Sequence, residues 1–170
     1  MKLGRLLFLI FLGVAGAGGV RMFFAEGIYV ATGSMLPTLQ VGSFLILDKM
    51  TINFSKPVPG DIVVFLAPVP PKKDMIKRVI AVGGDRVEMK KKKVFVNGEA
   101  LDEPYVQYTR SNSNLKGDSF EEETVPEGFL FLLGDNRDES NDASMWKDED
   151  GEPIRFIFSA RVRGYVRGFY

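Results

Sequence analysis

The side chains of this 170-residue chain that could do covalent chemistry come from a restricted set of amino acids. The chain contains no histidine and no cysteine. A Ser-His-Asp triad, a cysteine nucleophile, and zinc, haem or iron–sulfur sites held by His and Cys are therefore excluded. Hydroxyls, lysine amines, arginines and carboxylates remain, and three short segments combine them in ways that suggest chemistry.

The first segment is ATGSMLPTL, residues 31–39, in which Ser34 lies between a glycine and two large apolar residues. Gly33 allows the backbone to approach a ligand closely, and Pro37 keeps the segment out of a helix interior. These neighbours fit a serine whose hydroxyl is presented on a turn as a nucleophile. A lone turn serine more often bonds a nearby backbone group, so that alternative stays open at this point.

The second segment is MIKRVIAV, residues 75–82, whose apolar content predicts a β-strand. Strand alternation places Lys77 on one face and Arg78 on the other, each among apolar neighbours. A desolvated lysine loses its proton more readily, so Lys77 is a candidate general base. Arg78 stays charged and would need a carboxylate partner. The alternative is an edge strand from which both long side chains reach solvent.

The third segment is GDNRDESND, residues 134–142, which follows the apolar run FLFLL. Asp138, Ser140, Asp142, Ser144 and Glu149 have the spacing of calcium-loop ligands, but alanine occupies the position where that loop requires glycine. The competing interpretation is a hydrogen-bonded corner that positions Ser140 beside an active site. That corner would be built from Asp135, Arg137 and Asp138.

The elements that must position these segments are expected to be mainly β. Short runs rich in Val, Ile and Phe alternate with turn signals, and no helical period persists after residue 30. This pattern predicts an antiparallel, closed or partly closed β-barrel. Asn97-Gly98 is a two-residue hairpin signal. The predicted strands are Ser43–Asp48, Asp61–Leu66, Met75–Val82, Arg86–Met89, Val94–Val96, Gly128–Leu133 and Ile154–Tyr165.

Two polar stretches between the predicted strands are expected to lie in solvent. Lysines 90–93 precede the hairpin signal and are predicted to form a solvated hairpin tip. Residues 108–123 are predicted to form a polar connecting loop. Residues 31–170 carry slightly more acidic than basic side chains, so nucleic acid is not an expected partner.

The N-terminal 30 residues differ from the rest of the chain in composition. Lys2 and Arg5 precede the apolar run Leu6–Val20, which as a helix would reach ~22 Å, short of a ~30 Å hydrocarbon core. This pattern fits a cleaved signal peptide ending at Ala15-Gly16-Ala17, or an uncleaved anchor that extends past Arg21. Both interpretations export the remainder. Two parts are therefore expected, an N-terminal membrane anchor over 1–30 and an exported β-rich domain over 31–170.

Four segments within residues 31–142 occur in an order that resembles a known enzyme family. SMLPTL, KPVPGDIVVFLAP, IKRVIAVGGDRVE and VPEGFLFLLGDNRDESND are similar to the motifs of the type I (leader) signal peptidases. These are membrane-anchored serine endopeptidases that remove signal peptides from exported preproteins through a Ser/Lys dyad and an acyl-enzyme. The resemblance implies the same activity here, without metal or cofactor. It also favours the uncleaved transmembrane anchor over the cleaved signal peptide.

The resemblance further implies a role for individual residues. Ser34 would be the nucleophile and Lys77 its general base, while the Thr32 hydroxyl and the Ser34 N–H would form the oxyanion hole. Ser140 would hydrogen-bond and orient Lys77, and Asp142 would support the loop that carries Ser140. That loop would be shaped by Gly134, Asp135, Asn136, Arg137 and Asp138.

One position departs from the family motif. The family usually has arginine two residues after the aspartate that corresponds to Asp142, whereas this chain has Ser144 there. The ion pair that braces the loop in the family is therefore expected to be missing.

The resemblance also implies a cellular setting. The expected partners are exported preproteins with small residues at positions −1 and −3 and the lipid bilayer. The expected location is the bacterial inner (plasma) membrane, with a single span and the catalytic domain on the outer or periplasmic face. Peptidases that process conjugation or organellar precursors, or self-cleaving repressors, would share the dyad and differ in substrate. A non-catalytic exported β-domain that binds a partner is the alternative from another class.

Overall fold

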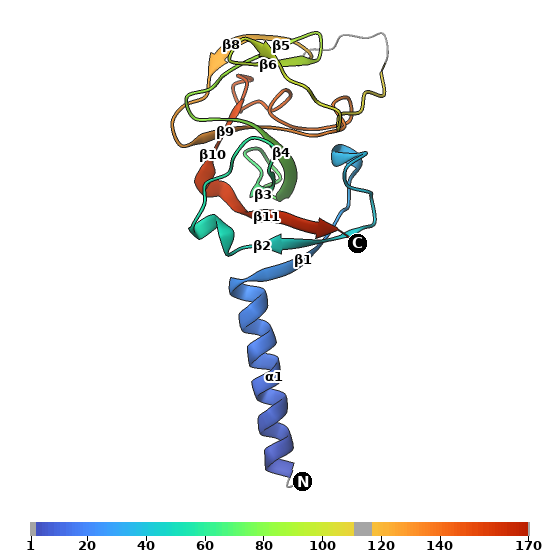
Figure 1. Cartoon of the computed structure of the whole chain (residues 1–170), viewed down its shortest axis with the longest axis vertical. Helices are drawn as coiled ribbons and strands as arrows, with labels where there is room; N and C mark the ends of the chain where they lie inside the picture. The colour runs from blue at the N-terminus through green and yellow to red at the C-terminus, as the bar shows by residue number, and fades with distance from the viewer. Residues whose placement is uncertain (1–2, 111–116, 170) are drawn as a thin grey trace.

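The computed structural model describes residues 3–110 and 117–169, and it has a β-rich body from which an N-terminal helix protrudes (Figure 1). This helix, α1, spans Leu3–Phe23. Three short 3₁₀ helices interrupt the body: η1 at Gly33–Met35, η2 at Thr51–Asn53 and η3 at Ser159–Arg161. All strand pairs within the sheets are antiparallel, as the sequence predicts.

The strands form two sheets. The larger has the order β1-β2-β11-β3-β4-β9-β10, and the smaller has the order β7-β6-β5-β8. The larger sheet consists of β1 (Ala25–Tyr29), β2 (Phe44–Asp48), β3 (Ile62–Leu66), β4 (Asp74–Val82), β9 (Phe129–Leu133), β10 (Phe156–Phe158) and β11 (Val162–Phe169). The smaller consists of β5 (Arg86–Lys90), β6 (Lys93–Val96), β7 (Glu99–Ala100) and β8 (Phe120–Thr124).

The predicted β-barrel is wrong, because the larger sheet stays open. Its order begins at β1 and ends at β10, and these edge strands do not pair in the described residues. After β4 the chain turns away to build the second sheet, and β9 then returns to pair with β4 only over Arg78–Val82. The first half of β4, Asp74–Lys77, pairs with β3 alone and has one open edge.

Most of the predicted strands are confirmed to within one residue at each end. The Asn97-Gly98 hairpin is also confirmed, with φ of 54° and 85° at its two central residues. Three differences remain. The segment Ile154–Tyr165 is two strands separated by η3, β8 lies inside the predicted 108–123 loop, and β1 was not predicted because its sequence AEGIY lacks a strand pattern. Residues 111–116 of that loop lie outside the described part of the chain.

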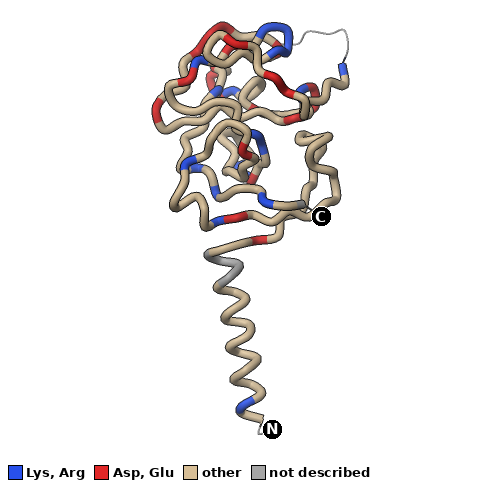
Figure 2. Tube along the Cα trace, in the orientation of Figure 1, with Lys and Arg blue, Asp and Glu red and all other residues tan. Residues whose placement is uncertain are grey.

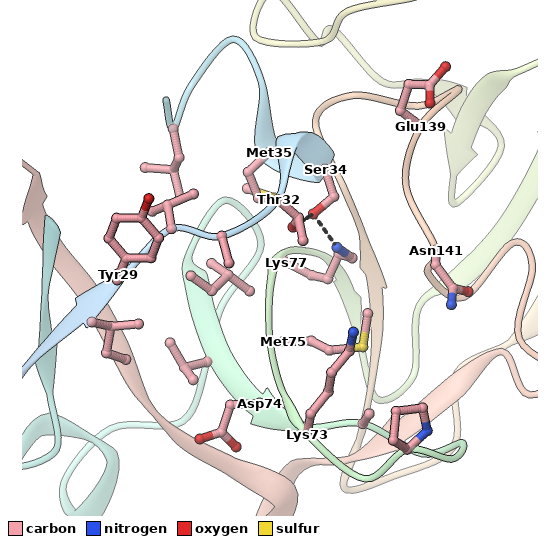
Figure 3. Close-up of a pocket in the computed structure, with 18 of the residues that line it drawn as sticks. Tyr29, Thr32, Ser34, Met35, Lys73, Asp74, Met75, Lys77, Glu139 and Asn141 are labelled. Carbon is pink, nitrogen blue, oxygen red and sulfur yellow. Dashed lines mark hydrogen bonds between the residues drawn. The ribbon is translucent and has the colours of Figure 1, made fainter. Parts of the chain in front are cut away.

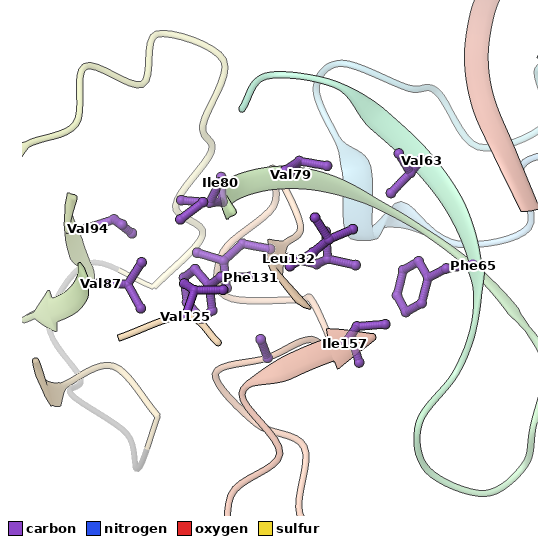
Figure 4. Packing of buried hydrophobic residues seen from close by; sticks show 14 of the residues in the cluster. Val63, Phe65, Val79, Ile80, Val87, Val94, Val125, Phe131, Leu132 and Ile157 are labelled. Atoms are coloured by element: carbon purple, nitrogen blue, oxygen red, sulfur yellow. The ribbon is translucent and has the colours of Figure 1, made fainter. Parts of the chain in front are cut away.

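A single core joins the two sheets (Figure 4). Full burial of a Val, Leu, Ile or Phe side chain contributes about 1.5–3 kcal/mol, so a cluster of this size fixes the strands that supply it. Because Val79 and Ile80 anchor the second half of β4 in this core, the residues just before them are held in place. Other labelled members are Val63, Phe65, Val87, Val94, Val125, Phe131, Leu132 and Ile157.

A second, smaller cluster lies under the Ser34 segment. Its buried members are Val30, Met35, Leu39 and Leu45, and Ile76 of β4 packs against them. The cluster ties η1 and the residues around it to both β2 and β4.

The helix α1 is apolar on all sides. Among its residues whose side chains are described, only Arg5 is charged, and the large apolar side chains are exposed (Figure 2). Within the described residues, no helix combines the length and the apolarity needed to cross a membrane, so the predicted transmembrane helix is not confirmed. Lys2, and the side chains around Arg21 by which the apolar run was expected to extend, lie outside the described residues.

Candidate active site

Ser34 lies in the middle of the short helix η1. The turn is closed by backbone bonds from the Leu36 N–H to the Gly33 carbonyl (3.1 Å) and from the Leu39 N–H to the Met35 carbonyl (2.9 Å). Met35 and Leu39 point into the smaller core cluster and are buried. The fixed neighbours leave the Ser34 hydroxyl at the surface of a groove.

Lys77 reaches this hydroxyl from β4, 43 residues later in the chain. Its Nζ donates a hydrogen bond to the Ser34 Oγ at 2.7 Å, and the lysine is 1% exposed (Figure 3). The Thr32 Oγ1 is 3.5 Å from the same Oγ. The structure therefore brings together three residues that the sequence singled out. Lys77 is buried and so does not reach solvent as it would from an edge strand. The Ser34 hydroxyl bonds a lysine, not a nearby backbone group as in an ordinary turn.

Burial lowers the pKa of Lys77 from its ordinary value of 10.5 to about 8. The carboxylates of Asp142 and Asp135 oppose this effect by raising the pKa, and the positive charge of Lys73 lowers it further. At mildly alkaline pH a large fraction of Lys77 is therefore neutral. A neutral amine at hydrogen-bonding distance from a hydroxyl can accept its proton.

Arg78, the next residue of β4, has a different environment. Its Nε and Nη2 donate to the two oxygens of Asp135 at 2.8 and 2.6 Å, and Asp135 is fully buried. The Thr38 hydroxyl donates to the same carboxylate at 2.5 Å, and the guanidinium stacks over the Tyr105 ring at 3.9 Å. The predicted carboxylate partner of Arg78 is thus Asp135. This ion pair joins β4 to the loop that follows β9.

Asn136 clamps that loop onto the nucleophile turn. Its backbone N–H donates to the Ser34 carbonyl at 3.1 Å, and its Nδ2 donates to the Gly33 carbonyl at 3.0 Å. Gly134 lies in the tightest part of the contact, where a Cβ would be 2.2 Å from the Ser140 Oγ and 2.5 Å from the Ser34 carbonyl oxygen. No side chain other than hydrogen fits there.

Arg137 and Asp138 bond outward, away from the groove. Arg137 pairs with Glu103 and also donates from Nε to the Gly134 carbonyl at 3.1 Å. Asp138 forms ion pairs with the side chains of Lys92 (2.8 Å) and Arg110 (2.9 Å). In the predicted corner of residues 135, 137 and 138, each side chain therefore forms its ion pair with a different segment, and Arg137 also bonds within the loop. Since Lys92 is largely buried against Asp138, it is not part of a solvated hairpin tip.

Asp142 is held by neutral donors. Its Oδ2 accepts from the Gly134 N–H at 2.8 Å, and its Oδ1 accepts from the Ser144 N–H and hydroxyl at 3.1 and 2.8 Å. Ser144 therefore braces the buried carboxylate in place of the missing arginine. With Asp138 and Asp142 committed to different partners, the calcium-loop interpretation has no support, and no cluster of metal-ligating side chains occurs in the described ranges.

Ser140 differs from its predicted arrangement. The residue is buried, but its Oγ has no hydrogen-bond partner among the described residues, so the predicted bond to Lys77 is absent. The physical reason is its direction, because the hydroxyl packs against the backbone of Gly134. Lys77 is oriented in this structure by Ser34 and by the strand that carries it.

A groove of about 320 Å³ extends from the Ser34–Lys77 pair along the open edge of β4. Its wall is mostly apolar and includes Ile28, Val30, Val64 and Ile76. Four charged residues line the groove, namely Lys73, Asp74, Lys77 and Glu139 (Figure 3). The arrangement offers a nucleophile, a buried amine and an apolar cleft with free strand edge.

Comparison with known proteins places the chain in a family. The family model "Signal peptidase, peptidase S26" matches residues 3–167. The chain belongs to the signal peptidase family, peptidase S26. It is 37% identical to signal peptidase I of Leptolyngbya laminosa over 142 residues, which cover 79% of this chain and 67% of that protein. It is 38% identical to signal peptidase I of Bacillus caldolyticus over 164 residues, covering 92% and 85%.

Other signal peptidases give a similar picture. The probable signal peptidase I-1 of a Synechocystis strain is 38% identical over 138 residues, 75% of this chain and 65% of that protein. The chain thus spans about two thirds of the length of its cyanobacterial relatives. A crystal structure of a signal peptidase I from Enterococcus faecalis aligns at 28% identity with a TM-score of 0.49, covering 66% of this chain and 98% of that one.

Membership confirms the resemblance found in the sequence, including the assignment of the chain as a signal peptidase I of the serine endopeptidase class. Some groove residues of this signal peptidase were not found from the sequence. Ile28 lies in the unpredicted strand β1, which carries no strand signal. Lys73 could have been found, because it precedes Met75 and Lys77 in the same two-residue alternation.

Proposed function

We propose that this chain removes signal peptides from exported preproteins, with Ser34 as the nucleophile and Lys77 as the general base. The observation that carries the proposal is the 2.7 Å contact between the Ser34 Oγ and a Lys77 amine that is buried and has a lowered pKa. A lysine in this state can do the work that histidine does in other serine proteases.

The first half of the reaction follows from this contact. Neutral Lys77 takes the proton of the Ser34 hydroxyl as Oγ bonds to the scissile carbonyl carbon. The carbonyl oxygen becomes an oxyanion, and the Ser34 N–H and the Thr32 hydroxyl are the donors proposed to meet it. Donors of this kind contribute on the order of 10²–10³ in rate each. The lysinium then gives its proton to the leaving amine as the C–N bond breaks.

The second half regenerates the enzyme. The signal peptide is left as an ester on Ser34, and Lys77 is neutral again. A water molecule attacks the ester carbon while Lys77 takes one of its protons. The same proton returns to Oγ as the C–O bond to Ser34 breaks, releasing the carboxylate of the signal peptide. The cycle needs neither metal nor cofactor.

The open edge of β4 explains how an extended peptide would bind. The Ala67 N–H donates a hydrogen bond to the Lys73 carbonyl. In the antiparallel register with β3, the backbone N–H and C=O groups of every second residue from Lys73 to Lys77 therefore point towards β3. Asp74 and Ile76 consequently direct their backbone groups away from β3, towards the side where β9 is absent. An extended substrate can add there as a further strand.

The apolar walls explain the proposed preference for small residues at −1 and −3. Alternate residues of an extended substrate point to the same side, so positions −1 and −3 would face one wall of the groove. Ile28, Val30, Val64 and Ile76 leave shallow apolar space beside Ser34. Large or charged side chains at these two positions would clash or be desolvated without a partner.

Membrane attachment through α1 is part of the proposal. The helix protrudes from the body and contacts it at the junction with β1 (Figure 1). Side chains such as Leu7, Phe8 and Phe11 are more than half exposed. An apolar helix of this kind is stable when lipid surrounds it. We propose that α1 anchors the chain as a single span in the bacterial plasma membrane, with the body on the outer face.

Two substitutions test the dyad in the full chain, purified in detergent. Ser34→Ala should abolish cleavage of a preprotein, and Lys77→Ala should lower kcat/KM by about 10²–10⁴ because the general base is lost. Ser55→Ala and Lys56→Ala are matched controls, since both residues are exposed and neither lines the groove. Normal cleavage by a folded Ser34 or Lys77 variant would contradict the dyad.

A further inference from the structure

Lys73 stands out among the charged residues of the groove. The Asp74 carboxylate is engaged by Arg163 at 3.1 Å, Lys77 is buried against Ser34, and Glu139 accepts a bond from the Thr109 hydroxyl at 3.3 Å. The Lys73 side chain, by contrast, makes no hydrogen bond and no ion pair within the part of the chain that the structure describes. It is an exposed ammonium in a cleft whose wall is mostly apolar.

The position of Lys73 is set by the strand that carries Lys77. Lys73 directly precedes β4 and continues its pairing with β3 through the bond from the Ala67 N–H to the Lys73 carbonyl, so the side chains of Lys73, Met75 and Lys77 lie on the same face. Figure 3 shows Lys73 and Lys77 on the same side of the groove with Met75 between them. The positive charge of Lys73 also contributes to lowering the pKa of Lys77, which agrees with this placement.

The spacing along β4 relates Lys73 to one part of a bound substrate. Lys73 and Lys77 are four positions apart along the chain, which corresponds to ~13 Å at ~3.3 Å per strand residue. If residue −1 lies at Lys77, as the proposed function requires, and the substrate strand runs parallel to β4 along its open edge, residues −4 to −6 come level with Lys73. The apolar subsites for −1 and −3 lie between these two points, so the N-terminal side of the cleavage site passes Lys73.

We propose that Lys73 is a specificity-determining residue of this groove that pairs with an acidic side chain at positions −4 to −6 of the preprotein. The inference rests on the proposed function and adds a charge preference to it. A carboxylate is the group that an unpaired ammonium selects, and a basic side chain at the same place would be repelled. The neighbouring Asp74 carboxylate does not cancel this preference, because it already forms an ion pair with Arg163.

The expected effect is moderate because the pair would be exposed. Exposed ion pairs are weak, so a substrate with aspartate should be cleaved about two- to fivefold faster than one with asparagine, measured as kcat/KM at low ionic strength. The preference should shrink as salt is added, since salt screens exposed charges.

The test uses the full chain in detergent and three peptides that differ only at one position. Each peptide carries the same apolar segment and small residues at −1 and −3, with Asp, Asn or Lys at −5, and the set is repeated at −4 and −6. Wild-type protein should rank the peptides Asp, Asn, Lys at one or more of these positions. Lys73→Met should flatten the ranking, and Lys73→Glu should reverse it.

Lys72→Met is the matched control, because Lys72 is the adjacent exposed lysine and does not line the groove. It should keep the wild-type ranking. An unchanged ranking in Lys73→Glu, or equal cleavage of the Asp and Lys peptides by wild type at all three positions, would overturn the inference while leaving the proposed function standing. If wild type cleaves none of the peptides and no preprotein, the proposed function fails and the inference fails with it.

Discussion

Lys77 and Arg78 are neighbours on β4 and both are buried, but only the charge of Arg78 is compensated by a directly bonded carboxylate. Arg78 is matched by a bidentate carboxylate, Asp135, and by the stacked ring of Tyr105. Among the described residues, the one group that Lys77 hydrogen-bonds through its side chain is the Ser34 hydroxyl. One face of the strand therefore holds a permanent ion pair, while the other holds an amine whose positive charge is poorly stabilised.

The difference shows how one strand can both stabilise the site and supply a reactive group. The Arg78–Asp135 ion pair is called the brace below, and the reactive group is the Lys77 amine. A buried ion pair fixes geometry because removal of either partner leaves an uncompensated charge. A buried amine without a directly bonded carboxylate loses its proton more easily, and the pKa of Lys77 falls to about 8 for this reason. The brace on the Arg78 face holds the loop 134–142 against Ser34, and the amine on the Lys77 face can then act on that serine.

The largest effect is expected from breaking the brace. Asp135→Ala leaves Arg78 buried without its partner and should lower the free energy of unfolding by about 3–5 kcal/mol. Denaturant unfolding followed by fluorescence of Trp146 measures this change. Glu122→Ala is the control, because its pair with Arg86 is exposed and should change stability by at most about 1 kcal/mol.

A double variant separates charge from packing. Replacing both partners by apolar residues, as in Arg78→Met with Asp135→Leu, removes the uncompensated charge and should recover much of the lost stability. If Asp135→Ala is no less stable than Glu122→Ala, the ion pair is not the brace that the geometry indicates.

The second effect concerns pH and the Lys77 face. Because the general base must be neutral, kcat/KM should rise with pH and level off above about 8, falling tenfold per pH unit well below that value. Three neighbouring charges act on Lys77: Asp142 and Asp135 raise its pKa, and Lys73 lowers it. Asp142→Asn should therefore move the midpoint to lower pH, and Lys73→Met should move it to higher pH.

A pH–rate profile of the cleavage reaction measures both shifts, with Lys72→Met as the unshifted control. Opposite directions are the decisive result, since a merely structural defect lowers the rate without displacing the midpoint. Midpoints that do not move in either folded variant would show that charge at a distance does not tune Lys77.

The sequence predicts the residues Ser34, Lys77 and Arg78 better than it predicts the contacts that make the environments of Lys77 and Arg78 different. The strand pattern placed Lys77 and Arg78 on opposite faces, and the motifs singled out Ser34, because both signals are local. The partner of Arg78 could not be identified, since Asp135 is 57 residues away and one of several carboxylates in its loop. The direction of the Ser140 hydroxyl depends on how closely that loop packs on Gly134, which no local pattern encodes.

The barrel prediction failed for a related reason. Strand patterns indicate which segments are extended, but not where a sheet ends. The β9 strand pairs with only half of β4, and this register leaves the edge open beside Lys77. Strand β1, which forms the opposite wall of the groove, contains Ala, Glu and Gly and is stabilised by pairing with β2 along its whole length.

The smallest effect is expected at Ser144. Its hydroxyl donates to Asp142 at 2.8 Å, but the Ser144 and Gly134 N–H groups remain as donors when the hydroxyl is removed. Ser144→Ala should therefore cost about 1 kcal/mol in the free energy of unfolding, measured by denaturant titration. Ser144→Thr keeps the hydroxyl and is the matched control.

This substitution also sharpens the contrast between the two carboxylates. Asp135 is bonded directly to the Arg78 cation, whereas Asp142 accepts bonds only from neutral donors among the described residues, and Asp142 raises the pKa of Lys77 more than Asp135 does. Ser144→Arg would place a cation beside Asp142 and should shift the pH midpoint of cleavage downwards, as Asp142→Asn does. A shift in the same direction and of similar size in both variants would establish that the negative charge of Asp142 raises the pKa of Lys77 against the larger, lowering effect of burial.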